Sequence, residues 1–307
     1  MATTLTVNSS FSGQDAGVII SKALLSGATL DANLITVKPN IKYKEVIQRM
    51  ETGDLLQVDS CDFSASSAVT MDERVIELKA VKVNLQLCKS AFLADWQAIS
   101  MGDSANKNFP KGVSDYLIAE MQKKIAAEVE VEIYQGDGTG SSIEGFEALF
   151  AADATVIDVA ATGITAGNVI AELGKVHAAI PAEILMADDL FLYVSQDIAS
   201  KYVTALGGFG SAGLGANGVQ GLGTQWYNNG SLTFNGVKMV VSKGLSQTKM
   251  FAATKSNLYY GTALLADDNT IKVIDMSDID GSDNVRFIAR MQHSVQYGYG
   301  AEVVYYS

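Results

Sequence analysis

The segment from Phe109 to Phe146 constrains the fold most, because it predicts one long helix that stops at a glycine-spaced turn. Pro110 suits the first turn of a helix, where a missing N–H has no intrahelical partner to lose. Good helix formers fill the stretch from there to Gly136. At 1.5 Å per residue, a helix over Lys111–Tyr134 spans roughly 36 Å, about the width of a domain. We therefore expect this helix to be the spine of the fold.

The apolar residues of this segment recur every four positions. A step of four overshoots one helical turn by about 40°, so the apolar stripe winds around the helix. We therefore expect the two ends of the helix to face different neighbours. The stripe consists of Leu117, Met121, Ile125, Val129 and Ile133.

Composition points to a globular chain that is covered by partners. Of its 307 residues, 48% are hydrophobic, which is ample for a sizeable core. Only 18% are charged, below the usual quarter, and few exposed charges are typical of a surface that meets other chains. The formal net charge of -12 argues against a dedicated nucleic-acid binder. An acidic wall that lets nucleic acid slide past remains compatible with it.

The sequence carries no targeting or redox signature. Cys61 and Cys88 form no CxxC pair, so we expect two free thiols. The N-terminus lacks the basic start and apolar core of a signal peptide. No run reaches the ~18 apolar residues of a membrane span. We expect a soluble chain made in the cytoplasm, with no membrane partner.

Residues 1–45 predict an N-terminal arm. They are rich in Thr, Ser, Asn and Gly, with short apolar patches at Val18–Ile20 and Leu24–Leu25. Two interpretations stay open here: a partly disordered terminus, or an arm that becomes ordered on a neighbour.

Residues 53–90 predict a long two-stranded projection. We expect an outgoing strand at Leu55–Val58, a Ser- and Ala-rich tip at Asp59–Asp72, and a long return strand. In the return strand, Ile76 and Leu78 are apolar in one phase, whereas Val81 to Leu87 alternate in the other. Because side chains alternate with a period of two, this phase change requires a bulge, a bend or a new burial partner. We expect the hairpin to leave its own domain and lie on a neighbouring subunit.

The rest of the chain predicts an α/β region followed by returning strands. A tract from Gly207 to Gly223 is too glycine-rich for a regular element and predicts a loop. We expect helices at 168–179 and 196–206, and strands at 190–194, 232–241, 250–253, 257–260, 270–275, 285–297 and 301–306.

Several short motifs resemble catalytic signatures and lack the required context. Gly208–Gly213 matches GxGxxG, but a predicted helix rather than a strand precedes it. Ser104–Lys107 matches SxxK and Ser282–Asn284 matches SDN, but no KTG strand follows. Asp278–Gly281 resembles part of a calcium loop, yet its register would make Met276 a ligand.

The ionisable residues form no catalytic constellation either. His177 and His293 have no acidic or cysteine neighbour at ligand spacing, so we expect structural roles for both. Glu128, Glu130 and Glu132 stand two apart on the helix and do not face each other, so we expect a solvent-facing or interface surface. We predict no catalytic, cofactor-binding or metal site, and no enzymatic activity.

In its order of elements the chain resembles the major capsid proteins of tailed bacteriophages. The resemblance rests on the polar arm, the hairpin, the helix exit at Tyr134–Phe146 and the glycine-rich loop within an α/β region. It implies the α+β phage-capsid fold, shared with encapsulin shells. The implied segments are an arm (1–45), an extended loop (46–92), a peripheral domain with the spine helix (93–150), an axial α/β domain (151–266) and strands returning to the peripheral domain (267–307).

The resemblance implies a structural protein of the virion, a capsid subunit that assembles with itself into hexamers and pentamers of an icosahedral shell around double-stranded DNA. No sequence-specific DNA contact is implied. We expect any scaffolding, portal or cement protein to be a separate chain. The predicted tip at Asp59–Asp72 has no Lys, so we expect no covalent cross-link through it. An encapsulin-like compartment shell is the alternative, and an α/β enzyme with an unrecognised site is a third possibility. The glycine tract is expected at a local symmetry axis, because glycine accepts several backbone paths.

Overall fold

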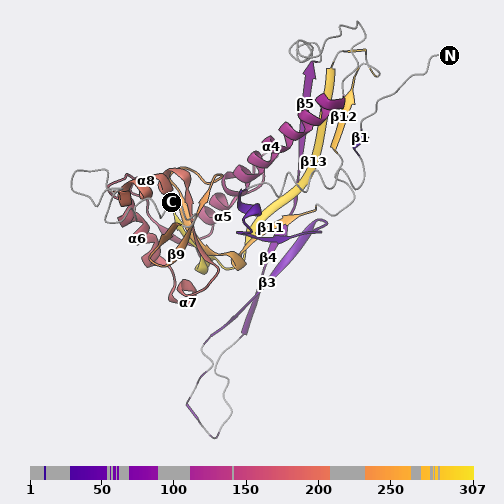
Figure 1. Cartoon of the computed structure of the whole chain (residues 1–307). Coiled ribbons are helices and arrows are strands. Elements are labelled where there is room, and N and C mark those ends of the chain that lie inside the picture. The colour runs from indigo at the N-terminus through magenta and orange to yellow at the C-terminus, as the bar shows by residue number, and fades with distance from the viewer. Residues whose placement is uncertain are drawn as a thin grey trace, which may run out of the picture.

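Within the part of the chain that the structure describes, the strands form two larger sheets and one two-stranded ribbon. The computed structural model describes residues 28–53, 69–88, 111–139, 142–207, 232–263, 271–276 and 284–307, together with 10–11, 56, 58–59, 61, 279 and 281–282. In Figure 1 the α/β lobe lies to one side of the long helix, while the ribbon and the long strands point in opposite directions.

The first sheet has the strand order β1-β12-β13-β11-β2, and β5 also pairs with β13. Along β13, the strand β5 pairs with residues 284–293 and β11 pairs with residues 293–297. The strands of this sheet are β1 (Ser10–Phe11), β2 (Thr36–Lys38), β5 (Lys79–Cys88), β11 (Leu258–Thr262), β12 (Ile271–Asp275) and β13 (Asn284–Tyr297).

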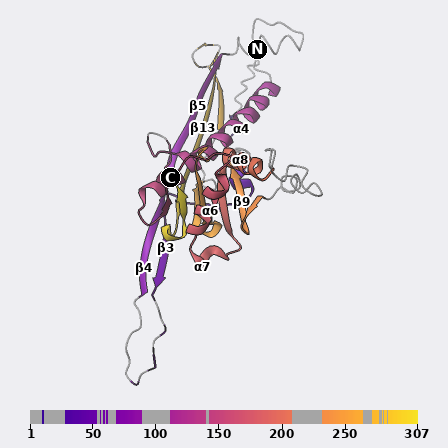
Figure 2. The same ribbon diagram turned by 90° about the vertical axis from the view of Figure 1, so that its left-hand side faces the viewer.

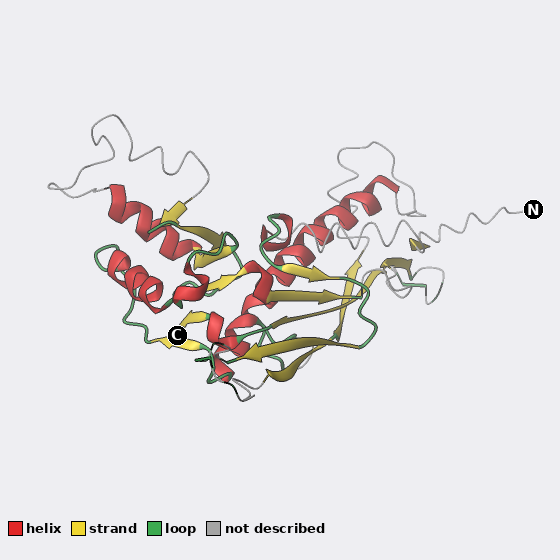
Figure 3. Ribbon diagram, turned by 90° about the horizontal axis from the view of Figure 1, so that it is seen from below, coloured by secondary structure: helices red, strands yellow, loops and turns green. Residues whose placement is uncertain are grey.

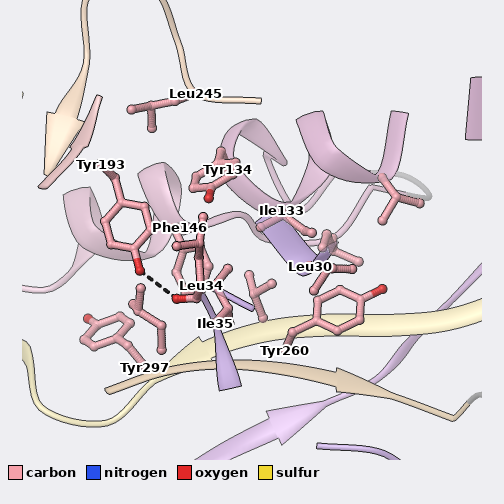
Figure 4. Close-up of a cluster of buried hydrophobic side chains, with 14 of the residues drawn as sticks. Leu30, Leu34, Ile35, Ile133, Tyr134, Phe146, Tyr193, Leu245, Tyr260 and Tyr297 are labelled. Atoms are coloured by element: carbon pink, nitrogen blue, oxygen red, sulfur yellow. Dashed lines mark hydrogen bonds between the residues drawn. The ribbon is translucent and has the colours of Figure 1, made fainter. Parts of the chain in front are cut away.

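The predicted spine is the helix α4 (Lys111–Gln135), which confirms the expectation of one long helix. Ile125, Val129 and Ile133 of the apolar stripe are buried against the first sheet, in one cluster with residues of β13 such as Phe287. Each such side chain contributes about 1.5–3 kcal/mol when it leaves water. Figure 4 shows this cluster, in which the Tyr193 hydroxyl donates to the Leu34 carbonyl at 2.7 Å.

The second sheet has the order β6-β14-β10-β7-β9-β8 and carries the α/β lobe. Its pairs β7–β9 and β14–β6 are parallel. Figure 1 shows α6 and α8 on the lobe, away from α4, and Figure 3 shows the molecule from below with its helices and strands in separate colours. Its strands are β6 (Ile157–Val159), β7 (Leu190–Ser195), β8 (Leu232–Phe234), β9 (Val237–Ser242), β10 (Met250–Thr254) and β14 (Val304–Tyr306).

The other described helices are α2 (Ala28–Asp31), α5 (Phe146–Ala152), α6 (Val169–Ala179), α7 (Ala182–Leu185) and α8 (Gln196–Gly207), with 3-10 turns η1 (Lys255–Asn257) and η2 (Gly300–Glu302).

The helix exit requires glycine at two positions because backbone meets backbone there. A Cβ on Gly136 would lie 2.2 Å from the Ile143 carbonyl oxygen, and one on Gly145 would lie 2.6 Å from the Gly136 nitrogen. The close approach allows the Gly145 N–H to donate to the Gly136 carbonyl at 2.8 Å. The chain thus turns from α4 directly into α5.

The hairpin differs from its prediction. Its strands are β3 (Lys44–Thr52) and β4 (Val69–Glu77), so the outgoing strand precedes the predicted Leu55–Val58, and β4 begins inside the predicted tip. Lys79–Cys88 is not part of the ribbon but pairs with β13. Of the three causes expected for the phase change, the structure shows a new burial partner, because the chain leaves the ribbon at Leu78 and enters the first sheet. Ile76 and Leu78 are buried with Ile41 and Ile47, whereas Val81 packs against the α4 cluster.

Three other expectations need correction. The strand predicted at 232–241 is two strands, because Asn235 and Gly236 adopt positive φ and form a tight turn that matches strand twist. The last strand, β14, pairs with β10 and β6 in the second sheet instead of returning with β12 and β13. Part of the predicted arm belongs to the body, since Leu30 and Ile35 are buried in the α4 cluster. Most of residues 1–27 and the glycine tract from 208 onward lie outside the described residues.

Candidate assembly surfaces

The ribbon β3–β4 has two unlike faces. On one face, Val46 stands opposite Val75 and Met50 opposite Met71, and all four are exposed, with Met50 at 61% and Met71 at 71%. On the other face, Ile47 is buried and Arg49 and Arg74 are half-buried. This alternation follows from the period of two in a strand. The chain therefore covers one face of the root of the ribbon and leaves the other apolar face open.

A charged cluster fastens the root of the ribbon to the body. Arg74 of β4 pairs with Asp153, which follows α5, and its guanidinium lies 4.2 Å from the ring centroid of Tyr297. The Tyr297 hydroxyl donates to the same Asp153 carboxylate at 2.6 Å. Asp153 also accepts from the Thr155 N–H at 2.8 Å. Asp153 and Tyr297 of the body thus converge on one arginine of the ribbon, and Thr155 supports the carboxylate.

A second contact repeats this arrangement one step along the ribbon. Arg49 of β3 pairs with Asp72 and donates to the Gly298 carbonyl at 3.1 Å. The Tyr299 hydroxyl accepts from the Met50 N–H at 3.0 Å and lies 3.1 Å from the Met50 carbonyl oxygen. Tyr299 is held in turn by Asn257, whose side chain bonds to its backbone on both sides. The ribbon therefore leaves the body in a fixed direction.

The Asp153 carboxyl is held ionised by its partners. Burial alone would raise its pKa, but hydrogen bonds from Arg74, Tyr297 and Thr155 together hold that pKa well below its usual range. Burial, together with the hydrogen bond to Asp153, raises the pKa of the Tyr297 hydroxyl well above its usual value, so tyrosine is the neutral donor. The Asp153 carboxylate and the Arg74 guanidinium therefore form an ion pair that holds the root of the ribbon against the body.

Two glutamates of α4 are buried or paired within the chain, which corrects the expectation that all three form a solvent-facing or interface surface. Glu130 is buried and accepts from the N–H and the hydroxyl of Thr29. The Tyr134 hydroxyl lies 2.9 Å from the Thr29 hydroxyl, and burial raises its pKa. Glu132 points the other way and lies 3.1 Å from Nε2 of His293. Glu128 is exposed, as expected.

The two histidines singled out in the sequence contact aromatic rings. His293 is fully buried on β13 and stacks on Tyr260, and His177 packs edge-on against Phe234. Both rings therefore pack against aromatic side chains, and structural roles for them stay a prediction. Cys61 is an exposed free thiol. Ser104–Lys107 and Gly208–Gly213 lie outside the described residues, as do Asp278, Asp280 and Asp283.

Within the described part of the chain, no three His, Cys, Asp or Glu side chains gather as metal ligands would. None of the described helices is both long enough and apolar enough to cross a membrane.

The sequence held part of the signal for the clamp. Arg49 and Arg74 share the phase of Ile47 and Ile76, which marks them as facing the body. Their partners Asp153 and Tyr297 are distant in sequence, and no local pattern connects them. The sequence therefore indicated the clamp only through two arginines that share the phase of buried apolar residues.

Comparison with known proteins identifies the fold. No family model matches the chain, and no curated protein matches it. Among solved structures, a chain of the native GTA particle capsid matches with a TM-score of 0.58 and 12% identity, covering 93% of this chain and 89% of that one. A chain of the satellite phage P4 procapsid matches with a TM-score of 0.55 and 11% identity, covering 94% and 98%.

A virus-like particle from Pyrococcus furiosus matches with a TM-score of 0.53 and 10% identity, covering 94% of this chain and 96% of that one. These likenesses extend over nearly the full length of both partners. The protein therefore has the fold of phage capsid subunits, as the order of its elements predicted.

Proposed function

We propose that this protein is the major capsid subunit of a tailed bacteriophage, a structural protein that assembles with itself into an icosahedral shell around double-stranded DNA. One observation carries the proposal: a capsid fold over nearly the whole chain, from which a ribbon projects with an uncovered apolar face. Hexamers and pentamers of the subunit would form the shell. Its place is the virion, after synthesis in the host cytoplasm.

The ribbon supports assembly because it is unstable by itself. An isolated two-stranded ribbon is marginal in water, and three strands or a packing partner are needed for stability. The chain clamps only the root, through Arg49 and Arg74. The exposed pairs Val46–Val75 and Met50–Met71 would be covered by a neighbouring subunit.

The test is electron microscopy of the purified protein. Closed particles of uniform size, with subunits arranged in rings of five and six, are the expected result. A protein that remains monomeric over a wide range of concentration, salt and added crowding agent contradicts the proposal. Mass photometry of the same samples gives the number of subunits per particle.

A compartment shell that holds protein cargo is the alternative, because a virus-like particle shares the fold. The arm favours a virion, since residues 1–27 are Thr- and Ser-rich rather than helix-forming. The contents of particles made in the native host decide between the two. Nuclease-protected DNA of uniform length supports the virion, and a co-purified enzyme of fixed stoichiometry supports the compartment.

The proposed shell would hold its DNA without gripping it. With a formal net charge of -12, the subunit offers few contacts to phosphate, so counterion release would contribute little to binding. We expect the isolated subunit to bind duplex DNA weakly, with a shallow dependence on salt. Tight binding with a steep salt slope, measured by fluorescence anisotropy, contradicts an acidic container wall. Any portal, scaffolding or cement protein would be a separate partner.

A further inference from the structure

The short helix α5 lies between the lobe and the first sheet and packs against both. In Figure 1 it lies between the helices of the lobe and the long helix α4. Measured between ring centroids, Phe150 of α5 lies 5.2 Å from Phe251 of β10 and 5.1 Å from Tyr297 of β13. All three side chains are buried. One ring of α5 therefore connects the second sheet to the first sheet.

The first turn of α5 is bonded to the lobe. The Glu147 carboxylate accepts from the Ser246 N–H at 2.8 Å and from the Ser246 hydroxyl at 2.7 Å. Ser246 lies in the turn between β9 and β10, beside Leu245, which is buried in the α4 cluster. Hydrogen bonds to an ionised group are stronger than those between neutral groups, and two bonds to one residue also fix its orientation. The turn of the lobe and the start of α5 are therefore held together as one unit.

The other end of α5 is bonded to the ribbon. Asp153 follows the last residue of α5, pairs with Arg74 of β4 and accepts from the Tyr297 hydroxyl at 2.6 Å. Asp153 stands six positions after Glu147, which corresponds to about 9 Å along a helix axis. A helix of seven residues thus carries the lobe at one end and the ribbon at the other.

These contacts leave α5 little freedom to move independently of either neighbour. Protein interiors are close-packed and transmit strain, so a displacement of the Ser246 turn shifts Phe150 and Asp153 with it. The ribbon β3–β4 projects far beyond the body in both Figure 1 and Figure 2. A small change of direction at Arg74 therefore becomes a large displacement at the far end of the ribbon.

We infer that α5 couples the position of the lobe to the direction of the ribbon, so that a lobe displaced by its neighbours re-aims the ribbon of the same chain. Glu147 is the positioning residue that receives the displacement, and Asp153 delivers it to Arg74. The inference rests on the self-assembly proposed above, because rings of five and of six would place the lobe in two environments. It adds the element through which one chain adjusts its ribbon to each environment.

The test is hydrogen exchange of the unassembled subunit, followed by mass spectrometry of peptides from the lobe, α5 and the ribbon. Glu147→Ala releases the Ser246 turn, so amides of β3 and β4 near the clamp should exchange about fivefold faster or more, as expected for coupled sites. Both hydrogen bonds that this change removes lie outside the ribbon. Because coupling is reciprocal, Asp153→Asn should in turn speed exchange in the turn at 243–249.

Asp197→Ala is the matched control. Asp197 lies in the first turn of α8 and pairs with Lys201, so its loss also removes one carboxylate and one polar contact from the lobe. This ion pair lies within α8, and its loss leaves the contacts of α5 intact. Exchange in the ribbon should stay within about twofold of the parent. The milder Glu147→Gln keeps the shape of the side chain, guards against misfolding and should give an intermediate acceleration.

The pattern of exchange decides the inference. Acceleration confined to the 243–249 turn, α5 and the ribbon supports it. Faster exchange in the turn with no change in the ribbon overturns it, while the proposed function stands. An equal acceleration in all peptides, those of α6 included, also overturns it, because that pattern reports global unfolding. Microscopy of the parent chain tests the proposed function separately: a parent that never assembles removes that function, and with it the role given to the coupling.

Discussion

The second sheet and the ribbon β3–β4 differ in how far the chain itself covers their strands. β7 lies between β10 and β9 and is buried along nearly its whole length. β4 has one strand partner, and apart from the half-buried Arg74 and the buried Ile76 its residues are exposed. Val and Met occur in strands of both the second sheet and the ribbon, so these apolar residues alone do not separate the two. The difference is where the partner resides: within the same chain for β7, and on another molecule for β4 under the function proposed here.

The sharpest test of this contrast is a truncation within the second sheet. Phe251 is fully buried and stacks on Tyr193 with ring centroids 4.5 Å apart. Phe251→Ala should lower the free energy of unfolding by about 3–5 kcal/mol, because it removes buried area and leaves a cavity. Urea denaturation of the unassembled subunit measures this loss. A loss below about 1 kcal/mol would mean that the packing of the second sheet does not stabilise the subunit more than the ribbon β3–β4 does.

A smaller effect is expected at the clamp, where the ribbon meets the body. Asp153→Asn keeps the shape but leaves Arg74 without its anion, so we expect a loss of about 1.5–3 kcal/mol at neutral pH. The folded chain holds the Asp153 pKa below its usual range, so the unfolded chain binds the proton first. The stabilisation is therefore complete above the ordinary aspartate pKa of about 4 and is lost as pH falls toward the folded-state value.

The difference between parent and Asp153→Asn should narrow in acid, as measured by denaturation at a series of pH values. Thr155→Val is a useful companion, since it removes one weaker hydrogen bond to the same carboxylate. A difference that stays constant from neutral to acidic pH would show that the ion pair does not stabilise the clamp.

The smallest change in stability is expected on the open face of the ribbon. Met50→Ser with Met71→Ser should alter the free energy of unfolding by no more than about 0.5 kcal/mol, because both side chains are already in water. Assembly should nonetheless weaken strongly, since apolar area that would be buried between subunits is lost. Met186→Ser, at a methionine of the lobe that is even more exposed, is the control. Unchanged particle formation in the double variant would contradict the claim that another subunit covers the ribbon, as the chain itself covers β7.

The sequence alone determined those features that depend on local patterns. The helix formers between Pro110 and Gly136 specified α4 from end to end, because helix propensity and glycine stops act over a few residues. The phase change near Ala80 located the point where the chain changes sheets, since the period of two is a property of each strand. The order of these elements was enough to predict the capsid fold that the structural likenesses confirm.

The tertiary structure decided which strands pair and which charges meet. Nothing local distinguishes β5 as a partner of β13 from β5 as the return strand of a hairpin, because both assignments bury Val81 and Val83 equally well. The same holds for β14, which joins the second sheet, and for Glu130, which looked like a surface residue until Thr29 and Tyr134 enclosed it. Strand pairing and ion pairing depend on atoms brought together from distant parts of the chain. The local sequence determines whether a surface is apolar or charged, and the tertiary structure determines which other surface packs against it.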